Sequence, residues 1–336
     1  MNDAAYLPFL HQTLRYFDRP HEGPALRPVV SPAAWKRRDV ASAPWRVALN
    51  ADEVDEVRDA VTSWRRRHAP LASMTKPDFP LPVLAPKLAT WRAEVAAGRG
   101  FQVVSGVPVD EWSVEEASIF FWGLGQHLGQ PGAQNRKGDL LGHVRDTGAD
   151  RNDRYVRQYP TTQNIPFHCD AADMVGLLCL RAAQSGGLSR IASSVSVYNE
   201  LLARRPDLAL RLFEPFMLDT RDEAEANGTK VLPVPPCRYA AGTLRTFWHS
   251  DYFRSAERHE GVRLTAVQNE LLDLYDEIAA SPEFHIDMDL VPGDVQLLSN
   301  HTIIHARTDY VDHPEPDHKR HLLRLWITLH DARSAP

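Results

Sequence analysis

From about residue 155 onward, the sequence is divided into short apolar runs that are separated by Gly, Pro and Asp. Such runs are typical of buried strands, which are shorter than helices and are bounded by turn residues. The runs do not alternate regularly with helical segments, as they would in a doubly wound α/β sheet. The pattern therefore predicts a mainly β protein, an antiparallel β-sandwich or jelly roll with helices on its outside. Strands are expected at 174–180, 295–298, 302–306 and 321–329.

The stretch before these runs carries helical signals instead. Asn50 and Ser113 are N-cap residues that are followed three positions later by Glu53 and Glu116, which is the capping-box pattern. Another amphipathic stretch stops at Gly98, a residue type that often terminates helices. A short strand is expected at 101–104, and further helices are expected near 195–202, from 207 onward, and from 265 to 280.

The 336 residues would allow two domains by length alone, but sandwiches with helical insertions also reach this size as single units. We expect an irregular N-terminal arm at 1–48, a single catalytic domain at 49–330 with a helical front and insertions, and a tail at 331–336. The glycine-rich segment 123–129 has the spacing GxGxxxG and follows a helical stretch. It is therefore one residue too long, and wrongly placed, for a dinucleotide-binding turn.

The composition excludes several classes of function. The net charge is −6 and the Lys and Arg residues are scattered, so a nucleic-acid partner is not expected. The chain begins without a signal-peptide pattern and holds no apolar run long enough to span a membrane. Three cysteines without CxxC spacing indicate neither a disulfide framework nor a zinc knuckle. We expect a cytoplasmic protein that acts on a small molecule; whether it forms a homo-oligomer is left open.

His-x-Asp triplets are the first candidates for a metal site, and with 15 histidines they are common by chance. The triplet at 285–287 lies in an alternating stretch whose polar residues are expected to face solvent. The triplet at 249–251 runs into a charged stretch that is typical of a surface. Only the triplet at 168–170 leads into a buried strand, so it is the preferred candidate.

In an extended segment, His168 and Asp170 point to the same side, while Cys169 points away. Two histidines and one carboxylate on one face of a metal form the facial triad of non-haem Fe(II) oxygenases. Structural zinc would need a fourth protein ligand, and none is evident. The second histidine would come from His301 or His305. These two lie about 13 Å apart on a strand at about 3.3 Å per residue, so only one can bind, and the spacing does not decide which.

The last strand carries two arginines on an otherwise apolar face. Arg320, Leu322, Arg324 and Trp326 fall on the same side of the strand. Desolvating a guanidinium is costly unless an anion pairs with it. An internal salt bridge and a bound ligand carboxylate are both compatible with this pattern.

Taken in order, these pieces resemble the taurine/2,4-D dioxygenase (TauD/TfdA) family of Fe(II)/2-oxoglutarate-dependent oxygenases. The resemblance covers about residues 98–329. Its motifs are Gly98-Arg99-Gly100-Phe101, Pro166-Phe167-His168-Cys169-Asp170, Ser185-Gly186-Gly187-Leu188-Ser189, Pro292-Gly293-Asp294, His305-Ala306-Arg307-Thr308 and Arg320-His321-Leu322-Leu323-Arg324.

The resemblance implies a distorted double-stranded β-helix of the jelly-roll, cupin-like type. It also implies His305 rather than His301 as the distal iron ligand. Ser189 matches a position that hydrogen-bonds 2-oxoglutarate, and Arg320 matches the arginine that pairs with its distal carboxylate. Arg324 matches a position that in some members reaches an anionic substrate, and its contact with 2-oxoglutarate instead is left open. Asn164 matches a substrate-contacting position.

One residue departs from the family pattern, because Cys169 stands where Thr is common. Its side chain is expected to point away from the metal, so the expected consequence is limited to sensitivity to oxidation. Three aromatic residues could either line a substrate wall or belong to the core: Trp248, Tyr252 and Phe253.

The activity implied is oxidation of a C–H bond of a small polar, or anionic, substrate by hydroxylation, desaturation or cyclisation. Fe(II), 2-oxoglutarate and O₂ would be required, and succinate and CO₂ released. Asp170 argues against halogenation, because related halogenases lack this carboxylate. Two alternatives remain: a divalent-metal hydrolase that uses the same three side chains, and a non-catalytic jelly-roll binding protein. The hydrolase would not explain Ser189 and Arg320.

Overall fold

A computed structural model describes residues 5–148, 161–221 and 230–330. Its centre is a mainly antiparallel sheet in which seven strands are found among these residues. The long strand β17 pairs with β6 along its length, and on its other side with β4 and then β3. In spatial order the sheet comprises β1 (Arg46–Ala48), β2 (Phe101–Ser105), β14 (Val295–Ser299), β6 (Met174–Arg181), β17 (His321–Thr328), β3 (Gln130–Gly132) and, beside β17, β4 (Gly142–Val144).

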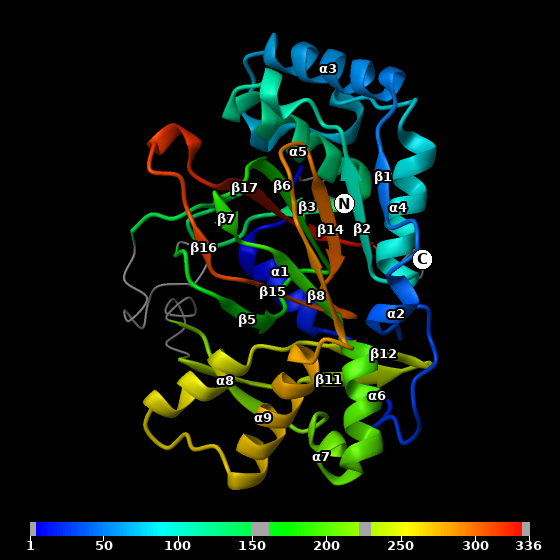
Figure 1. The fold of residues 1–336 in the computed structure, drawn as a ribbon, viewed down its shortest axis with the longest axis vertical. Coiled ribbons are helices and arrows are strands. Elements are labelled where there is room, and N and C mark those ends of the chain that lie inside the picture. The colour runs from blue at the N-terminus through cyan, green and yellow to red at the C-terminus, as the bar shows by residue number, and fades with distance from the viewer. Residues whose placement is uncertain (1–4, 149–160, 222–229, 331–336) are drawn as a thin grey trace.

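A second, four-stranded antiparallel sheet packs against the first (Figure 1). Its order is β13 (His285–Met288), β8 (Ser189–Ser193), β15 (Ile303–Arg307) and β5 (Ile165–His168). Smaller pairs complete the β structure in the described residues: β7 (Ser185–Gly186) with β16 (Tyr310–Val311), β9 (Phe216–Asp219) with β10 (Val231–Val234), and β11 (Cys237–Ala240) with β12 (Thr243–Thr246). The two packed sheets confirm the jelly-roll prediction.

The strand alternation of β17 shows why these residues form a sandwich. Leu323, Leu325 and Ile327 pack outward against helices. Leu322 and Trp326 point inward, into a core shared with Ile191 of β8 and Ile303 of β15. Arg324 lies on the inner face of the strand and Arg320 directly precedes the strand, and both are buried, so two cations stand at one end of an apolar core.

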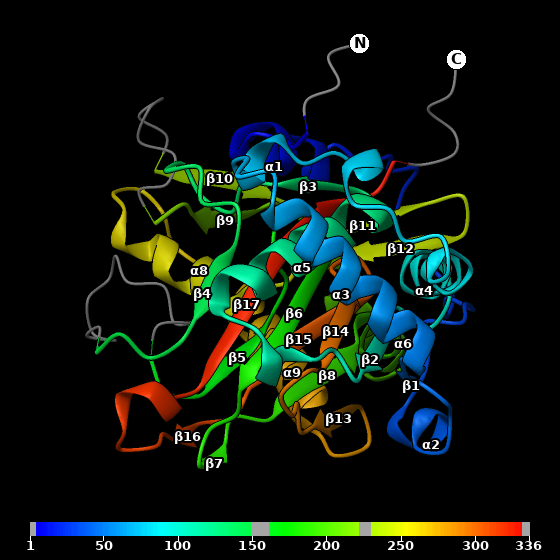
Figure 2. The same ribbon diagram turned by 90° about the horizontal axis from the view of Figure 1, so that it is seen from above.

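Three long helices cover the outer face of the large sheet. Figure 2 shows α3 crossing over α5, with strands β17, β6 and β14 beneath them. The helices are α3 (Ala51–Arg65), α4 (Ala85–Ala97) and α5 (Val114–Leu128). The capping boxes predicted at Asn50 and Ser113 are both present, and α4 ends at Gly98 as expected.

A second group of helices packs on the outer face of the small sheet, at the lower end of Figure 1. It comprises α6 (Ser194–Arg204), α7 (Pro206–Arg211), α8 (Ser250–Ser255) and α9 (Ala266–Ala280). Thr265 caps α9, which begins where a helix was expected, and forms a capping box with Gln268. Short 3-10 turns connect elements of both groups at η1 (Leu71–Ser73), η2 (Lys76–Asp78), η3 (Val109–Glu111), η5 (Ala256–Arg258) and η6 (Pro316–His318).

The N-terminal segment differs from the irregular arm that was expected. It contains helices α1 (Phe9–Phe17) and α2 (Arg37–Val40), and it ends in strand β1, which joins the edge of the large sheet. Helix α1 lies beside the two sheets rather than apart from them (Figure 1). The Pro and Arg residues of this segment made helix α1 difficult to predict, although one face of the helix is buried against the rest of the protein. The predicted tail, 331–336, lies outside the described residues.

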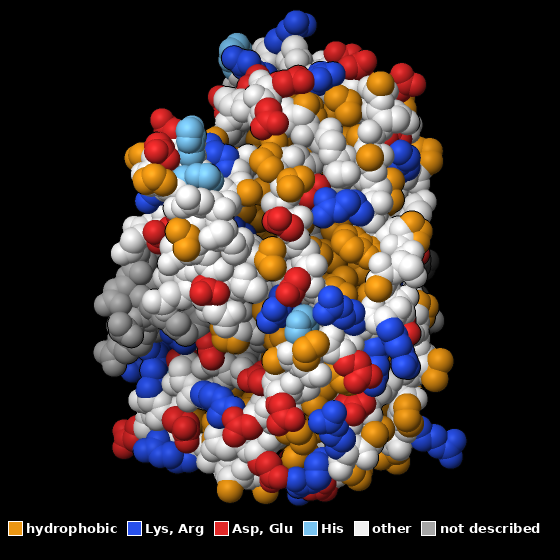
Figure 3. Space-filling model, in the orientation of Figure 1, with side chains coloured by type: hydrophobic (Ala, Val, Ile, Leu, Met, Phe, Trp, Pro, Cys, Tyr) orange, Lys and Arg blue, Asp and Glu red, His pale blue; other side chains and the backbone are white. Residues whose placement is uncertain are grey.

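The molecular surface in view carries acidic, basic and apolar side chains in a mixed pattern, without a continuous basic face (Figure 3). Among the described residues no helix is long and apolar enough to cross a membrane.

Candidate active site

The two histidines at the centre of the site are cross-strand neighbours. Strand β15 runs antiparallel to β5, and in this register His305 stands directly opposite His168. Their ring centroids are 4.2 Å apart. The sheet register therefore brings together two residues that are 137 positions apart in the chain.

Asp170 follows β5 and faces the same point as the histidines. Its Oδ2 lies 3.8 Å from His305 Nε2. The Asn300 side chain accepts a hydrogen bond from the backbone N–H of Asp170, which fixes the chain at this position. Cys169 points the other way, with its sulfur against the carbonyls of Thr246 and Ile303. The predicted alternation of these three residues is thus present.

Both histidines are in the protonation state that a metal ligand needs. Burial, together with the nearby His168, lowers the pKa of His305 to about 3. Burial also lowers the pKa of His168. His168 Nδ1 donates to the Pro166 carbonyl at 2.9 Å, so its lone pair lies on Nε2.

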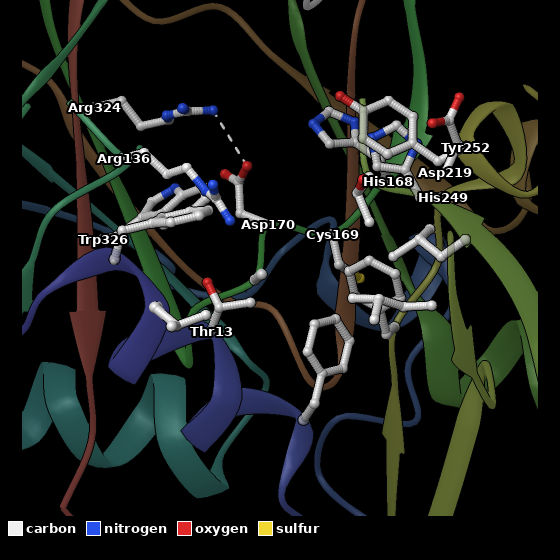
Figure 4. A pocket seen from close by; sticks show the side chains of 18 of the residues that line it. Thr13, Arg136, His168, Cys169, Asp170, Asp219, His249, Tyr252, Arg324 and Trp326 are labelled. Carbon is white, nitrogen blue, oxygen red and sulfur yellow. Dashed lines mark hydrogen bonds and ion pairs between the residues drawn. The ribbon is translucent and has the colours of Figure 1, made fainter. Parts of the chain in front are cut away.

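The Asp170 carboxylate also contacts a cation, because Arg324 Nη1 lies 3.2 Å from Oδ1 (Figure 4). As the side chains stand, no three His, Cys, Asp or Glu residues in the described ranges form a group that could hold a metal ion. The carboxylate is turned partly toward the guanidinium, while the two imidazoles face each other.

Two cavities meet at this cluster. The outer cavity, shown in Figure 4, opens toward helix α1, and the inner cavity lies between the two sheets. Four residues line both of them: Ile165, His168, Asp170 and Arg324. Two of the three candidate ligands, His168 and Asp170, therefore stand at the junction of the two cavities, while His305 lines the inner one.

The inner cavity is lined by Ser189, Arg307 and Arg320 in addition to the shared residues. Ser189 Oγ donates to Gln296 Oε1 at 2.8 Å. Gly187 adopts a φ of 70°, and a Cβ there would stand 3.0 Å from Arg320 Nε. Glycine at this position thus leaves room for the Arg320 side chain.

The two guanidiniums of the inner cavity flank one aromatic ring. Arg307 lies 4.8 Å and Arg320 5.1 Å from the ring centroid of Tyr310. Neither guanidinium has a salt bridge to any described residue, and Arg320 Nη1 is buried without a hydrogen-bond partner there. Burial lowers the pKa of Arg320, and it lowers that of Arg307 to about 10. Two buried cations in one small space need anionic compensation.

The outer cavity contains a histidine that the sequence interpretation missed. The 249–251 triplet was expected on a charged surface, and this was wrong: His249 lines the cavity and forms a bridge with His168. The rings of His168 and His249 are 5.3 Å apart, and His249 stacks on Tyr252 at 3.6 Å. Burial lowers the pKa of His249 well below its usual value. Only the apolar pair Phe247-Trp248 before the triplet could have signalled a buried position.

Two other candidate histidines lie outside this cluster. His285 was expected to face solvent but is buried, whereas Asp287 of the same triplet is exposed and pairs with Arg190. His301 lies before β15, where its Nε2 contacts Asp173 Oδ1 at 2.8 Å. His301 is thus held in a different contact, and His305 is the one beside His168.

The remaining candidates fall into two groups. Tyr252 lines the outer cavity, whereas Trp248 and Phe253 are fully buried in the core under α9. Asn164 is exposed and is not among the described residues that line either cavity.

The kinds of side chain gathered here match an iron ion and 2-oxoglutarate, although Asp170 would have to turn from Arg324 toward the two histidines to complete the ligand set. Two neutral imidazoles and a carboxylate are the donor set that non-haem Fe(II) sites use. A dicarboxylate would supply the anionic charge that Arg307 and Arg320 lack, and it would do so in a cavity that also reaches the three candidate ligands.

Comparison with known proteins agrees with this chemistry. Residues 67–326 match the family described as taurine catabolism dioxygenase TauD, TfdA family. FR-33289 synthase of Streptomyces rubellomurinus (strain ATCC 31215) is 30% identical over 315 residues, which cover 92% of this chain and 93% of that protein.

Two solved structures have the same fold. Asparagine oxygenase, in complex with Fe(II), 3-hydroxyasparagine and succinate, superposes with a TM-score of 0.67 at 17% identity and covers 84% of this chain and 93% of its own. The non-haem iron oxygenase OrfP, in complex with Fe, succinate and hydroxyarginine, has a TM-score of 0.64 at 16% identity, with 86% and 96% covered. At these identities the likeness establishes the fold.

Proposed function

The chain belongs to the TauD/TfdA family of Fe(II)/2-oxoglutarate-dependent dioxygenases, and from this premise we propose that it oxidises an unactivated C–H bond of a small substrate that carries an anionic group. The observation that carries the proposal is the junction of two cavities at His168, Asp170 and Arg324. A reaction that consumes a co-substrate and a substrate at one metal needs two such spaces, each open to the metal.

In this proposal His168, Asp170 and His305 hold the iron. Asp170 would share its carboxylate between the metal and Arg324, whose guanidinium is 3.2 Å away. When iron, 2-oxoglutarate and O₂ are bound together, they supply an oxidant strong enough for a C–H bond and release succinate and CO₂. The three side chains would set where this chemistry occurs, because all three line the inner cavity and two of them, His168 and Asp170, also line the outer one.

The inner cavity would bind 2-oxoglutarate. Arg320 would pair with the distal carboxylate through its buried Nη1, and Ser189 would add a hydroxyl contact. Arg307 adds a second buried cation beside Tyr310. Such charge-assisted bonds in a desolvated space are strong and favour a dianion over neutral molecules.

The outer cavity would bind the substrate. Arg324 and Arg136 line one side of it, and Figure 4 shows both guanidiniums near Asp170 and Trp326. An anionic group placed there would hold the rest of the substrate beside His168 and His249. The exposed position of Asn164 gives no support to its predicted substrate contact.

The alternatives account for less of the geometry. A metal hydrolase would not explain the two buried arginines of the inner cavity. A binding protein would not explain two buried histidines whose pKa values are lowered and which lie side by side where the cavities meet. The three cysteines are buried and unpaired, which fits a reducing, cytoplasmic setting. Residues 1–48 are proposed to belong functionally to the catalytic unit, since α1 lines the outer cavity.

The proposal is tested by CO₂ release from carboxyl-labelled 2-oxoglutarate in the presence of Fe(II) and O₂. Wild type should release CO₂ slowly without substrate, and His305→Ala should release none above the level of free iron. The matched variant is His301→Gln, which keeps a donor for Asp173 and should retain the activity. Equal release by all three proteins would exclude a protein-bound iron centre at His305.

A further inference from the structure

Resting on this proposed function, we propose that helix α1 is a substrate-binding element, and that it selects substrates with an apolar body attached to the anionic group. Helix α1 (Phe9–Phe17) lies before the family-matched region, which begins at residue 67. The helix therefore adds to the outer cavity a wall that the family motifs do not contain.

The helix is fixed to the body at both of its ends. Before it, Leu7 forms a parallel bridge with Gly132 of β3: the Leu7 N–H donates to the Pro131 carbonyl, and the Leu7 carbonyl accepts from the Ala133 N–H. At its end, Tyr16 donates to the Asn300 carbonyl at 2.9 Å and stacks on His301. Arg19, just beyond it, forms a buried salt bridge with Asp173. The Asn300 side chain also accepts from the backbone N–H of Asp170. Asn300 therefore contacts both helix α1 and a candidate iron ligand.

A different face of the helix lines the outer cavity. Phe9, Leu10, Thr13 and Phe17 point into it, at the spacing of one helical face. Tyr16 and Gln12, whose Nε2 donates to the Ala133 carbonyl at 3.3 Å, lie on the buried face instead. Three further apolar side chains line the cavity beyond α1, namely Leu218 of β9, Leu232 of β10 and Phe247, and Asp219 and Thr220 follow Leu218 in the lining.

The apolar wall is continuous with the cationic end of the cavity. The Arg324 guanidinium lies 5.1 Å from the ring of Trp326, and the ring of Phe9 stacks on that of Trp326 with the centroids 6.2 Å apart. At the far end, Phe17 packs against Phe247 at 4.9 Å. A substrate whose anionic group pairs with Arg324 would thus extend along α1 over hydrocarbon.

Two features distinguish a binding wall from a helix that only fills space. Leu10 lines the cavity and is still 49% exposed, so apolar surface remains to be covered. Thr13 Oγ is buried without a hydrogen-bond partner among the described residues, although a helical Thr can usually bond to the preceding turn. Figure 4 shows Thr13 on the cavity side, below Asp170. A ligand contact would satisfy both groups.

Leu14 provides a matched control on the same helix. It is 58% exposed, similar to Leu10, but it is not among the described residues that line the cavity. Leu10→Ser and Leu14→Ser therefore remove the same side chain from similarly exposed positions, and only Leu10 lines the cavity.

The test is calorimetric binding of linear alkanesulfonates with two, four, six and eight carbons to the Fe(II)- and 2-oxoglutarate-loaded protein without O₂. Wild type should bind more tightly by about 4-fold for each added methylene until the wall is covered. Leu10→Ser should lose about 3- to 10-fold affinity for the longer chains and keep its affinity for ethanesulfonate. Leu14→Ser should match wild type throughout.

An affinity that is independent of chain length, or equal losses in the two variants, would overturn the role of α1. Failure of the proposed function is recognised separately, because 2-oxoglutarate binding is measured in the same calorimeter before each sulfonate is added. If 2-oxoglutarate does not bind but the sulfonate affinity still depends on chain length, the cofactor assignment is wrong and the role of α1 in substrate binding stands.

Discussion

Arg324 Nη1 stands 3.2 Å from Asp170 Oδ1, so the carboxylate proposed to bind iron is already held by the cation proposed to bind substrate. The same guanidinium donates from Nε to Gln134 Oε1 at 2.8 Å, which fixes its orientation. Arg324 therefore couples the charge of the proposed iron ligand Asp170 to the charge of the anionic group proposed for the substrate.

This coupling predicts a selective defect in Arg324→Gln. The variant removes the guanidinium that faces the outer cavity, and charge-assisted hydrogen bonds of this kind contribute about 1.5–3 kcal/mol. Affinity for ethanesulfonate should fall by at least about 10-fold, while the affinity for 2-oxoglutarate should change by less than about 3-fold. Calorimetry with each ligand separately measures both values. The opposite ranking would assign Arg324 to the co-substrate.

Arg320→Leu should abolish 2-oxoglutarate binding without unfolding the protein. Arg320 is buried and has no salt bridge to any described residue, so its replacement by an apolar side chain removes an unfavourable desolvation. Thermal unfolding should show a melting temperature at or above that of wild type, and stabilisation by 2-oxoglutarate should be lost.

Arg190→Leu in β8 is the control for Arg320→Leu, since Arg190 is paired with Asp287 near the surface. This variant should keep stabilisation by 2-oxoglutarate. A wild-type response in Arg320→Leu would show that the co-substrate lies elsewhere.

Much of the fold could be predicted from the sequence, because local signals agree with the tertiary structure. The capping boxes at Asn50, Ser113 and Thr265 begin helices α3, α5 and α9, and the apolar runs became β6, β14, β15 and β17. The strand alternation at 168–170 also predicted which side chains would converge.

The outer cavity could not be predicted in the same way. His249 reaches His168 through a single bridge between segments 81 residues apart, and charged residues after the triplet concealed it. Helix α1 carries Gln12 and Arg15 beside its apolar residues, so its cavity face becomes recognisable only when Tyr16 and Leu7 anchor it. Both features depend on tertiary contacts without a local motif.

Asp276 on α9 predicts a pH-dependent stability difference. Burial raises the pKa of its carboxyl to about 6, and Trp248 Nε1 donates to it at 2.8 Å. A raised acid pKa means that the group stabilises the fold fully below about pH 4 and loses this contribution as the pH rises through 6. The free energy of unfolding of Asp276→Asn, relative to that of wild type, should therefore rise by about 2 kcal/mol between pH 4 and pH 7, allowing for partial solvent screening.

Urea unfolding at pH 4, 5, 6 and 7 checks this expectation. Asp273→Asn is the control on the same helix, because that carboxylate is 75% exposed and paired with Arg254. Its effect should stay within about 0.5 kcal/mol at every pH. A flat difference for Asp276→Asn would contradict the buried, protonatable carboxyl.

The three cysteines should resist modification in the folded protein. Burial raises the pKa of Cys169, Cys179 and Cys237 to about 12, and the thiolate is the reactive form. Iodoacetamide at pH 8 should label none of them within an hour and all of them in urea, as counted by mass spectrometry. Rapid labelling of Cys169 alone would show that reagents reach this thiol, between His168 and Asp170, through the outer cavity. It would also support the expected sensitivity of Cys169 to oxidation.

The central claim is that His168, Asp170 and His305 form one iron centre that 2-oxoglutarate reaches from the inner cavity. Anaerobic titration of 2-oxoglutarate into the Fe(II)-loaded protein tests it most directly, by the weak visible metal-to-ligand charge-transfer band. We predict that the band appears in wild type and in His301→Gln and is absent in His168→Ala and His305→Ala. A band that survives His305→Ala, or that is lost only in His301→Gln, would contradict the assignment of the iron ligands.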